Sequence, residues 1–154
     1  MKDSRVNEPS VGLGSDLYFD FVTSYQDVMG WIKDLMRQHG ITLAQYGVLR
    51  NLHEREGLRL SDLSERLVCA NSNVTRLIDC LSEQGLVERI EDRSDRRVTR
   101  ARLTGKGRRL RDEITPRYEA YLSRLTAGFT DQERAAFTRL LAKLRRRAMK
   151  PAAL

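Results

Sequence analysis

The chain has few of the residues on which disulfide-rich, metal-binding and many catalytic proteins depend. Its 154 residues include two cysteines and two histidines. Two isolated cysteines provide no disulfide framework and are typical of a reducing compartment. The four side chains that could hold zinc match no ligand spacing; they are His39, His53, Cys69 and Cys80. We therefore expect no disulfide, no metal site and no cofactor.

Signatures of enzymes, membrane proteins and secreted proteins are missing as well. The chain contains no Gly-x-Ser-x-Gly, no phosphate-binding loop and no Cys-x-x-Cys, so nothing indicates a catalytic site. No apolar run approaches the roughly 18 residues that cross a membrane. The N-terminal segment Met1-Lys2-Asp3-Ser4-Arg5 lacks the apolar core of a signal peptide. These absences predict a cytoplasmic protein that is neither an enzyme nor a membrane protein.

Basic charge, by contrast, is plentiful and unevenly placed. The formal net charge is +7, and residues 86–111 and 139–150 each contribute +6 against a net acidic remainder. A basic region on such a body is typical of proteins that bind polyanions. The second region has a simpler explanation too, because Lys and Arg are favoured at helix C-termini whether or not DNA is bound.

Two short helical patterns stand next to each other in the middle of the chain. The first has leucines at helical spacing and Ser61 as a candidate cap; the leucines are Leu60, Leu63 and Leu67. About four residues then lead to a second helix, which Asn71 can cap and Gly85 can end. Its inward face consists of Val74, Ile78 and Leu81, with Leu77 beside them. Such a pair predicts a helix-turn-helix, whose second helix reads the major groove of DNA.

Polar side chains gather at the start of the second helix. Ser72, Asn73, Thr75 and Arg76 are residue types that pair with base edges and phosphates. Taken on their own, these residues are better explained as a solvated helix face. The helix before them favours the DNA-reading interpretation.

A charged hairpin follows the second helix. Residues 86–90 and 98–103 are predicted to form two strands, and residues 91–97 form a turn rich in arginine. A polar helix beside a basic β-hairpin is typical of a winged helix, which contacts two grooves of DNA.

Taken together, these segments resemble the MarR family of dimeric winged-helix transcription factors over about residues 15–148. The similarity is sharpest in Asn73-Val74-Thr75-Arg76, Leu81, Gly85-Leu86-Val87, Arg89, Asp92-Arg93-Ser94-Asp95-Arg96-Arg97 and Leu103-Thr104-Gly105-Lys106-Gly107. The resemblance implies a mainly α (α+β) fold: a winged helix-turn-helix with a β-hairpin wing, and extra N- and C-terminal helices that form a dimerisation lobe. It implies one domain over residues 1–154, with a DNA-binding lobe at 42–103 and a dimerisation lobe at 15–39 and 104–150.

The resemblance also assigns roles to the residues of the wing. Arg96 would enter the minor groove, while Asp95 and Arg97 would pair and stiffen the hairpin, with Asp92 as a competing partner for Arg97. The full set of expected DNA-binding residues is Ser61, Ser72, Asn73, Thr75, Arg76, Arg93, Asp95, Arg96 and Arg97.

The remaining segments are expected to be helical apart from a loose arm at residues 1–14. A first helix should end near Gly40, and Thr42-x-x-Gln45 and Thr130-x-x-Glu133 have the spacing of capping boxes. An apolar stripe runs from Leu110 to Phe129 in a long helix that Pro116 should bend. We expect these outer helices to form a two-fold dimer through Leu17, Phe21, Tyr118, Tyr121, Leu122, Leu125, Phe129, Phe137, Leu140, Leu141 and Leu144.

Many members of the family bind small aromatic acids in a cleft between the two lobes. By resemblance, the segments that would line it contain Trp31, Arg37, His39, Tyr46 and Arg50. Each has a simpler explanation: the aromatic residues as core, the arginines as solvated side chains, and His39 as a partner of the helix dipole.

The cysteines fall in the helix-turn-helix and not in the first helix, where some members of the family sense oxidants. Cys69 is expected to behave as a small buried hydrophobe. The spacing of Cys80 from Asn73 and Arg76 places it on the DNA-facing side of its helix, as an inert residue or, alternatively, as a redox-sensitive thiol.

These observations predict a sequence-specific, DNA-binding transcriptional regulator. We expect a homodimeric repressor of palindromic operators on double-stranded DNA, released by a small-molecule effector. The alternative is a winged helix used for DNA architecture or protein contact without an inducer.

Overall fold

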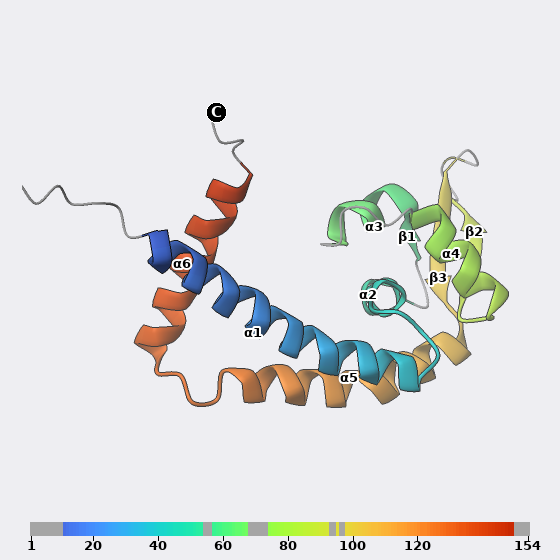
Figure 1. The fold of residues 1–154 in the computed structure, drawn as a ribbon. Coiled ribbons are helices and arrows are strands. Elements are labelled where there is room, and N and C mark those ends of the chain that lie inside the picture. The colour runs from blue at the N-terminus through green and yellow to red at the C-terminus, as the bar shows by residue number, and fades with distance from the viewer. Residues whose placement is uncertain (1–10, 54–56, 68–73, 93–94, 96–97, 150–154) are drawn as a thin grey trace, which may run out of the picture. The chain divides into compact units, whose positions relative to one another are not determined.

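The computed structural model describes residues 11–53, 57–67, 74–92, 95 and 98–149. Within them the chain is mainly helical, with a small antiparallel sheet (Figure 1). The elements in chain order are α1 (Val11–Gln38), α2 (Leu43–Asn51), β1 (Leu58–Arg59), α3 (Leu60–Arg66), α4 (Val74–Glu83), β2 (Val87–Glu91), β3 (Thr99–Leu103), α5 (Gly105–Leu125) and α6 (Asp131–Ala148).

The chain divides into two compact units, residues 1–114 and residues 115–154. The first unit holds α1 to α4, the sheet and the first half of α5, and the second holds the rest of α5 and α6. The division into a DNA-binding lobe and a dimerisation lobe stays a prediction.

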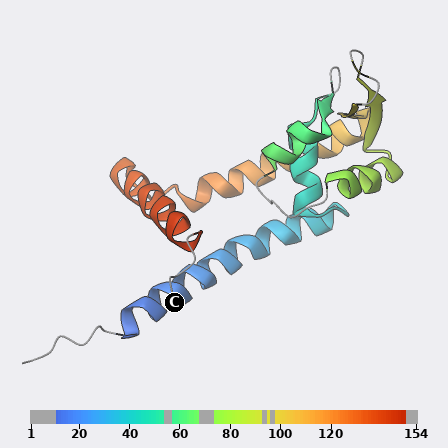
Figure 2. The same ribbon diagram turned by 90° about the horizontal axis from the view of Figure 1, so that it is seen from above.

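α1 is a single long helix, clear in both views of the ribbon (Figure 2). It begins at Val11, so the expectation of a loose arm up to residue 14 was wrong for its last residues. The helix ends where expected. Gly40 has a φ of +68°, and the amide of Ile41 donates to the carbonyl of Met36 at 3.2 Å. A glycine in this left-handed conformation closes the helix without the strain that a Cβ would bring.

The predicted capping box of α2 is confirmed. The amide of Gln45 donates to the hydroxyl of Thr42 at 3.2 Å, and the amide of Thr42 donates to the side-chain carbonyl of Gln45 at 2.7 Å. α3 differs from expectation at its start. Its N-cap is Arg59, which makes no side-chain cap, so Ser61 lies one residue inside the helix and is not the cap.

The sheet has the strand order β1-β3-β2, and both pairings are antiparallel. In the hairpin, Val87 lies opposite Leu103 and Arg89 opposite Ala101. β1 pairs with the other edge of β3, with Leu58 opposite Ala101. The hairpin was predicted, whereas β1, which is two residues long, was not.

The core lies where α1, α2, α4 and the sheet meet. The predicted inward face of α4 is confirmed, because Val74, Ile78 and Leu81 are buried. α4 ends as predicted, since Gly85 has a φ of +67°. Other core residues include Leu35, Met36, Tyr46, Leu49, Leu52, Leu63, Val87, Ala101, Leu103 and Ile114.

The segment Leu103-Thr104-Gly105-Lys106-Gly107 fastens the start of α5 to the end of α4. The hydroxyl of Thr104 donates to the carbonyl of Gly85 at 2.7 Å and accepts from the amide of Gly107 at 3.0 Å. The ammonium group of Lys106 donates to the carbonyl of Gln84 at 2.8 Å. Gly107 packs so tightly that a Cβ there would lie 2.0 Å from the carbonyl oxygen of Leu86. Each residue of this motif except Gly105 therefore has a specific contact.

In the second unit, α5 continues through Pro116 and ends at Leu125. Phe129 lies beyond that end, so the prediction that one helix carries the stripe as far as Phe129 was wrong. The bend at Pro116 stays a prediction. α6 begins with the predicted capping box, in which the Thr130 amide donates to the Glu133 carboxylate at 2.8 Å. Hydrogen bonds from the Thr130 backbone and side chain lower the pKa of Glu133.

Both units carry large apolar side chains that the chain itself leaves exposed. In α1 these include Leu17 and Phe21, and in α6 they include Leu140 and Leu144. Phe129 and Phe137 touch edge to face, with ring centroids 6.0 Å apart. No helix within the described residues is long and apolar enough to span a bilayer.

Candidate nucleic-acid interface

The first turn of α4 presents polar side chains away from the core. Val74 is buried, whereas Thr75 and Arg76 are exposed. Successive residues of a helix are turned by about 100°, which is why one core residue and two outward residues can follow one another. Ser72 and Asn73 lie outside the described residues. α4 thus offers Thr75 and Arg76 on the side expected to read DNA.

α3 contributes Ser61, which is exposed in its first turn. Its hydroxyl donates to the carboxylate of Asp62 at 3.2 Å. This hydroxyl is accessible to a phosphate.

Arg89 of β2 connects the wing to α4. Its guanidinium donates to the carboxylate of Asp79 at 2.5 Å and lies 3.5 Å from the carbonyl of Thr75. Asp79 is on α4 one turn after Thr75, so one arginine of the wing strand spans the start of the reading helix. The position of β2 relative to Thr75 and Arg76 is therefore fixed by the contact between Arg89 and Asp79 as well as by packing in the core.

Asp92, at the end of β2, is the buried centre of the wing. It is 3% exposed, and its Oδ2 accepts from Nε of Arg100 at 2.7 Å and from Nε of Arg59 at 3.3 Å. Arg59 and Arg100 lie opposite each other in β1 and β3. One carboxylate therefore ties all three strands together at the root of the wing.

The same carboxylate also shapes the turn that follows. Asp92 Oδ1 accepts from the amide of Asp95 at 3.3 Å, and the amide of Val98 donates to the carbonyl of Asp95 at 2.9 Å. The side chain of Asp95 is exposed. Three other expected wing residues, Arg93, Arg96 and Arg97, lie outside the described residues, and so does the expected Asp95–Arg97 pair.

Asp92, Arg59 and Arg100 are the residues of the wing that sequence reasoning missed. Asp92 was considered as a competing partner for Arg97, and Arg59 and Arg100 were not considered. The sequence contained a pattern for only one of these pairs. Arg100 is eight residues from Asp92 across a predicted hairpin, so a cross-strand pair between them could have been inferred. Arg59 could not have been found, because β1 was not predicted.

The residues expected to line a ligand cleft are only partly brought together. Tyr46 is 1% exposed in the core, and the guanidinium carbon of Arg50 lies 6.0 Å from the centre of its ring. Arg37 is exposed and pairs with Asp34 at 2.9 Å. Trp31 is exposed on α1.

His39 joins the end of α1 to α5. Its side chain is 10% exposed, Nδ1 lies 2.9 Å from the carbonyl oxygen of Leu35, and Nε2 lies 3.4 Å from the carboxylate of Glu113. The contact with the last turn of α1 agrees with the simpler expectation of a helix C-terminal partner.

Cys80 does not lie where its spacing suggested. Its Sγ accepts hydrogen bonds from the side-chain amides of Gln45 at 3.2 Å and Gln84 at 3.4 Å. Gln45 is a buried residue of α2, so Cys80 faces α2 and not the DNA side. The prediction failed because spacing along one helix does not show which neighbouring element covers a given side chain. Four- and seven-residue steps do bring Cys80 back near the side of Arg76 and Asn73, but at its own turn of α4 it meets Gln45 of α2. Cys69 lies outside the described residues.

The described residues contain no cluster of three or more His, Cys, Asp or Glu side chains that could hold a metal ion. The candidate DNA-binding residues that the structure describes lie in the wing, α3 and α4.

Comparisons with known proteins point to one family. The MarR family model matches residues 41–99. The HTH-type transcriptional regulator YsmB of Bacillus subtilis is 36% identical over 112 residues, which cover 73% of this chain and 77% of YsmB.

Solved structures give the same result. A MarR-like transcription regulator from Bacillus cereus superimposes with a TM-score of 0.70 at 25% identity and covers 87% of this chain and 96% of its own. BpsR of Bordetella bronchiseptica, whose DNA binding is regulated by 6-hydroxynicotinic acid, gives a TM-score of 0.66 at 25% identity, covering 84% of this chain and 98% of its own.

Proposed function

Since the chain belongs to the MarR family of DNA-binding transcriptional regulators, we propose that it represses genes by binding palindromic operators as a homodimer and leaves them when a small molecule binds. Family membership also confirms that the chain is a regulator and not an enzyme. The fold is that of the family, with a winged helix-turn-helix and extra helices at both ends.

The observation that carries the proposal is the contact between Arg89 of the wing and Asp79 of α4, which we call the brace. Arg89 of β2 contacts Asp79 and Thr75 of α4, and Thr75 and Arg76 are exposed on the same helix. A reading helix held in a fixed relation to its wing supports sequence-specific contacts, because specificity needs side chains placed within hydrogen-bond distance of particular base edges. A protein that only compacts DNA has no need of such placement.

Exposed apolar side chains support the dimer. α1 and α6 each present phenylalanines and leucines to solvent, and clusters of exposed apolar side chains mark interaction sites. A two-fold dimer would cover it and would place one winged helix on each half-site, about one DNA turn apart. A protein covering two half-sites blocks access to a promoter, which supports repression.

The proposal of a ligand rests on relatives more than on geometry. BpsR responds to an aromatic acid, and the present chain has an arginine over an aromatic ring at Arg50 and Tyr46. For Trp31, Arg37 and His39 a ligand role stays a proposal. A small aromatic acid is the class we expect, because an arginine can pair with its carboxylate while aromatic side chains hold its ring.

The alternative function is a winged helix for DNA architecture or protein contact without an inducer. Both functions can be separated by selecting genomic fragments that bind the purified full-length protein and sequencing them. We expect a palindromic consensus whose half-sites are about one helical turn apart. Bound fragments without any shared sequence would contradict specific operator binding and favour the architectural function.

A further inference from the structure

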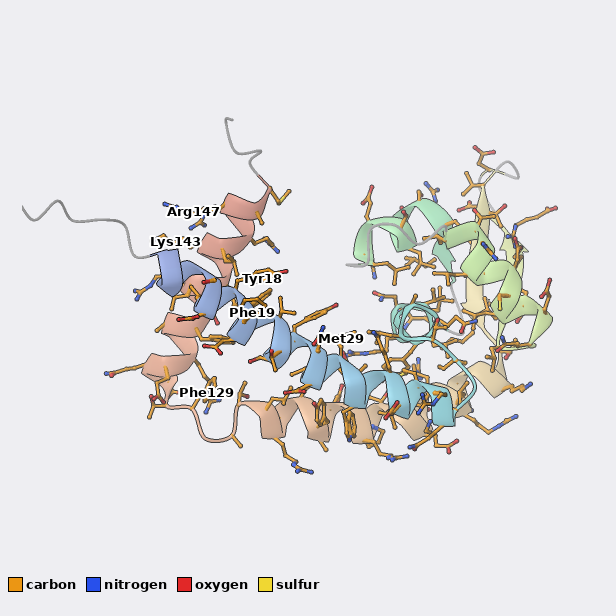
Figure 3. The ribbon with its side chains drawn as sticks, in the orientation of Figure 1. Tyr18, Phe19, Met29, Phe129, Lys143 and Arg147 are labelled. Atoms are coloured by element: carbon orange, nitrogen blue, oxygen red, sulfur yellow. The ribbon has the colours of Figure 1, made fainter. Side chains whose placement is uncertain are left out.

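The second half of α6 carries a row of basic side chains that the proposed function leaves unused. Arg139, Lys143 and Arg147 follow one another at four-residue steps, and all three are exposed. Residues four apart lie on the same side of a helix, and Lys143 and Arg147 can be followed on successive turns of α6 in Figure 3. We refer to these three residues as the α6 basic row.

The helix dipole accounts for only part of this charge. Basic residues are favoured in the last turn of a helix, and α6 has Arg145, Arg146 and Arg147 there. Arg139 and Lys143 lie before the last turn, where the dipole has little effect. Their positions therefore need another explanation.

No acidic residue neutralises the row from within its own helix. The sequence has no Asp or Glu after Glu133. In the described part of the chain, α6 has an ion pair only in its first turn, between Arg134 and Asp131 at 4.0 Å. Three exposed cations therefore share one side of a helix without a carboxylate partner among the described residues.

The row borders the apolar stripe of α6. Lys143 and Arg147 lie three residues after Leu140 and Leu144, and residues three apart are neighbours on a helix surface. Both leucines are exposed, Leu140 by 58%. A dimer that covers the stripe would leave the row at its rim, where long basic side chains can keep their charged ends in solvent.

We propose that the α6 basic row binds the phosphate backbone of DNA without regard to sequence, as a contact additional to those of the winged helix. The proposal rests on the DNA-binding function of the family and on none of the proposed ligand contacts. Two of the three residues are arginines, whose planar guanidinium pairs with phosphate through two hydrogen bonds. Each phosphate that a cation neutralises releases bound counterions from DNA, and this release favours binding.

DNA is favoured over a membrane surface because of the stripe beside the row. A basic amphipathic helix binds lipid by burying its apolar face in the bilayer, which requires that face to be free. The proposed dimer occupies the apolar face, whereas contact with phosphates needs only the basic row. The experiment must nevertheless be able to detect binding of the row to an anionic lipid surface.

The test is the salt dependence of binding to a random-sequence duplex several helical turns long, measured by fluorescence anisotropy with full-length protein. In the variant Arg139→Gln/Lys143→Gln/Arg147→Gln, the slope of log K against log salt should become shallower by about 2 to 3, since each lost phosphate contact removes about 0.9. Glutamine keeps a high helix propensity, so the variant should fold and sediment like the wild type.

A matched control removes the same charge elsewhere. Lys33→Gln/Arg117→Gln/Arg124→Gln changes three exposed cations and should leave the slope unchanged. The proposal is wrong if the row variant keeps the wild-type slope, if the control lowers the slope equally, or if the wild type fails to bind the duplex at low salt. A wild type that binds random DNA but selects no palindrome would contradict operator binding and leave this comparison intact.

Vesicles of phosphatidylcholine and phosphatidylserine give the second arm of the experiment. We expect no difference between wild type and row variant in co-flotation with these vesicles. Loss of vesicle binding in the row variant, with an unchanged slope on DNA, would assign the row to lipid and overturn the proposal.

Discussion

Among the glycines that the structure describes, Gly107 leaves the least room for a side chain. An added Cβ would meet the carbonyl oxygen of Leu86 at 2.0 Å and its carbonyl carbon at 2.9 Å. Both are backbone atoms, so neither can rotate away as a side chain would. Gly107→Ala should lower the free energy of unfolding by about 3 kcal/mol, at the upper end of the usual cost of overpacking, as measured by urea denaturation.

Gly105→Ala is the matched control for this prediction. Its Cβ would have an ordinary contact, 3.7 Å from the side chain of Arg109, and alanine is the better helix former by about 0.5–1 kcal/mol. Stability should therefore stay level or rise slightly. Equal losses in the two variants would mean that the close approach at Gly107 is not what determines the effect.

The second residue with a strong expected effect is Asp92. In Asp92→Ala, two arginines at the root of the wing lose a carboxylate that lies 2.7 Å and 3.3 Å from their Nε atoms. Hydrogen bonds to charged groups contribute about 1.5–3 kcal/mol, and we expect a loss of about 2–3 kcal/mol because both arginines stay partly exposed. Amide hydrogen exchange should increase in β2 and β3.

The neighbouring Glu91→Ala serves as its control, since Glu91 is exposed and next to Asp92 in sequence. Its effect on stability should stay within about 0.5 kcal/mol, as for most surface substitutions. Similar destabilisation in both variants would show that negative charge in general, and not the contacts of Asp92, stabilises the wing.

At the scale of elements, the junction of α4 with the wing gives a prediction about DNA affinity. The direction of the change separates the effect of charge from the effect of the Arg89–Asp79 contact. Asp79→Asn weakens the charged contact with Arg89 and at the same time removes a negative charge near bound DNA. Charge alone would make DNA binding tighter, because phosphates repel carboxylates. If the brace matters, operator affinity should instead fall, by about threefold to tenfold, in an anisotropy titration at constant salt.

Glu83→Gln removes an equal charge from the same helix. Glu83 is exposed one turn later in α4 and makes no hydrogen bond or ion pair with the wing among the described residues. This control should bind operator DNA as tightly as the wild type or slightly more tightly. Tighter binding by both variants would contradict the role of the brace.

Elements that are specified by nearby residues were predictable from the sequence. The capping boxes at Thr42 and Thr130, the glycine end of α4 and the hairpin all depend on residues within a few positions of one another. β1 was missed because two residues carry no periodic pattern, and its pairing with β3 joins residues more than 40 positions apart. Cys80 was misplaced because its position depends on Gln45 of another helix.

The candidate site was predictable to a similar degree. Residue types and spacing indicated which helix is expected to read DNA, because the buried face of α4 leaves only one side for polar residues. The sequence could not reveal that Asp92 is the centre of the wing, since Asp92 and Asp95 are both acids in the same turn. Only burial separates the two.

At the scale of the whole molecule, the exposed stripe of α6 gives a prediction about assembly. We expect the wild type to sediment with roughly twice its chain mass of 17.8 kDa. Leu140→Asp places a charge in the proposed apolar interface, where an unpaired carboxylate is costly, and should shift the protein to monomer in sedimentation velocity.

Ala135→Asp is the corresponding control on the same helix. Ala135 is exposed and is turned away from the apolar stripe of α6, so the same new charge should leave the dimer intact. A wild-type monomer, or a Leu140→Asp variant that stays dimeric, would count against α6 as part of the interface.

The close approach at Gly107 has a consequence for how this chain can evolve. Every missense change at that codon adds a Cβ. No conservative replacement exists, and we expect neutral substitutions not to accumulate at this position. Gly105, two codons away in the same motif, has room for a side chain and can vary. We therefore expect substitutions to be removed by selection at Gly107 and to be tolerated at Gly105.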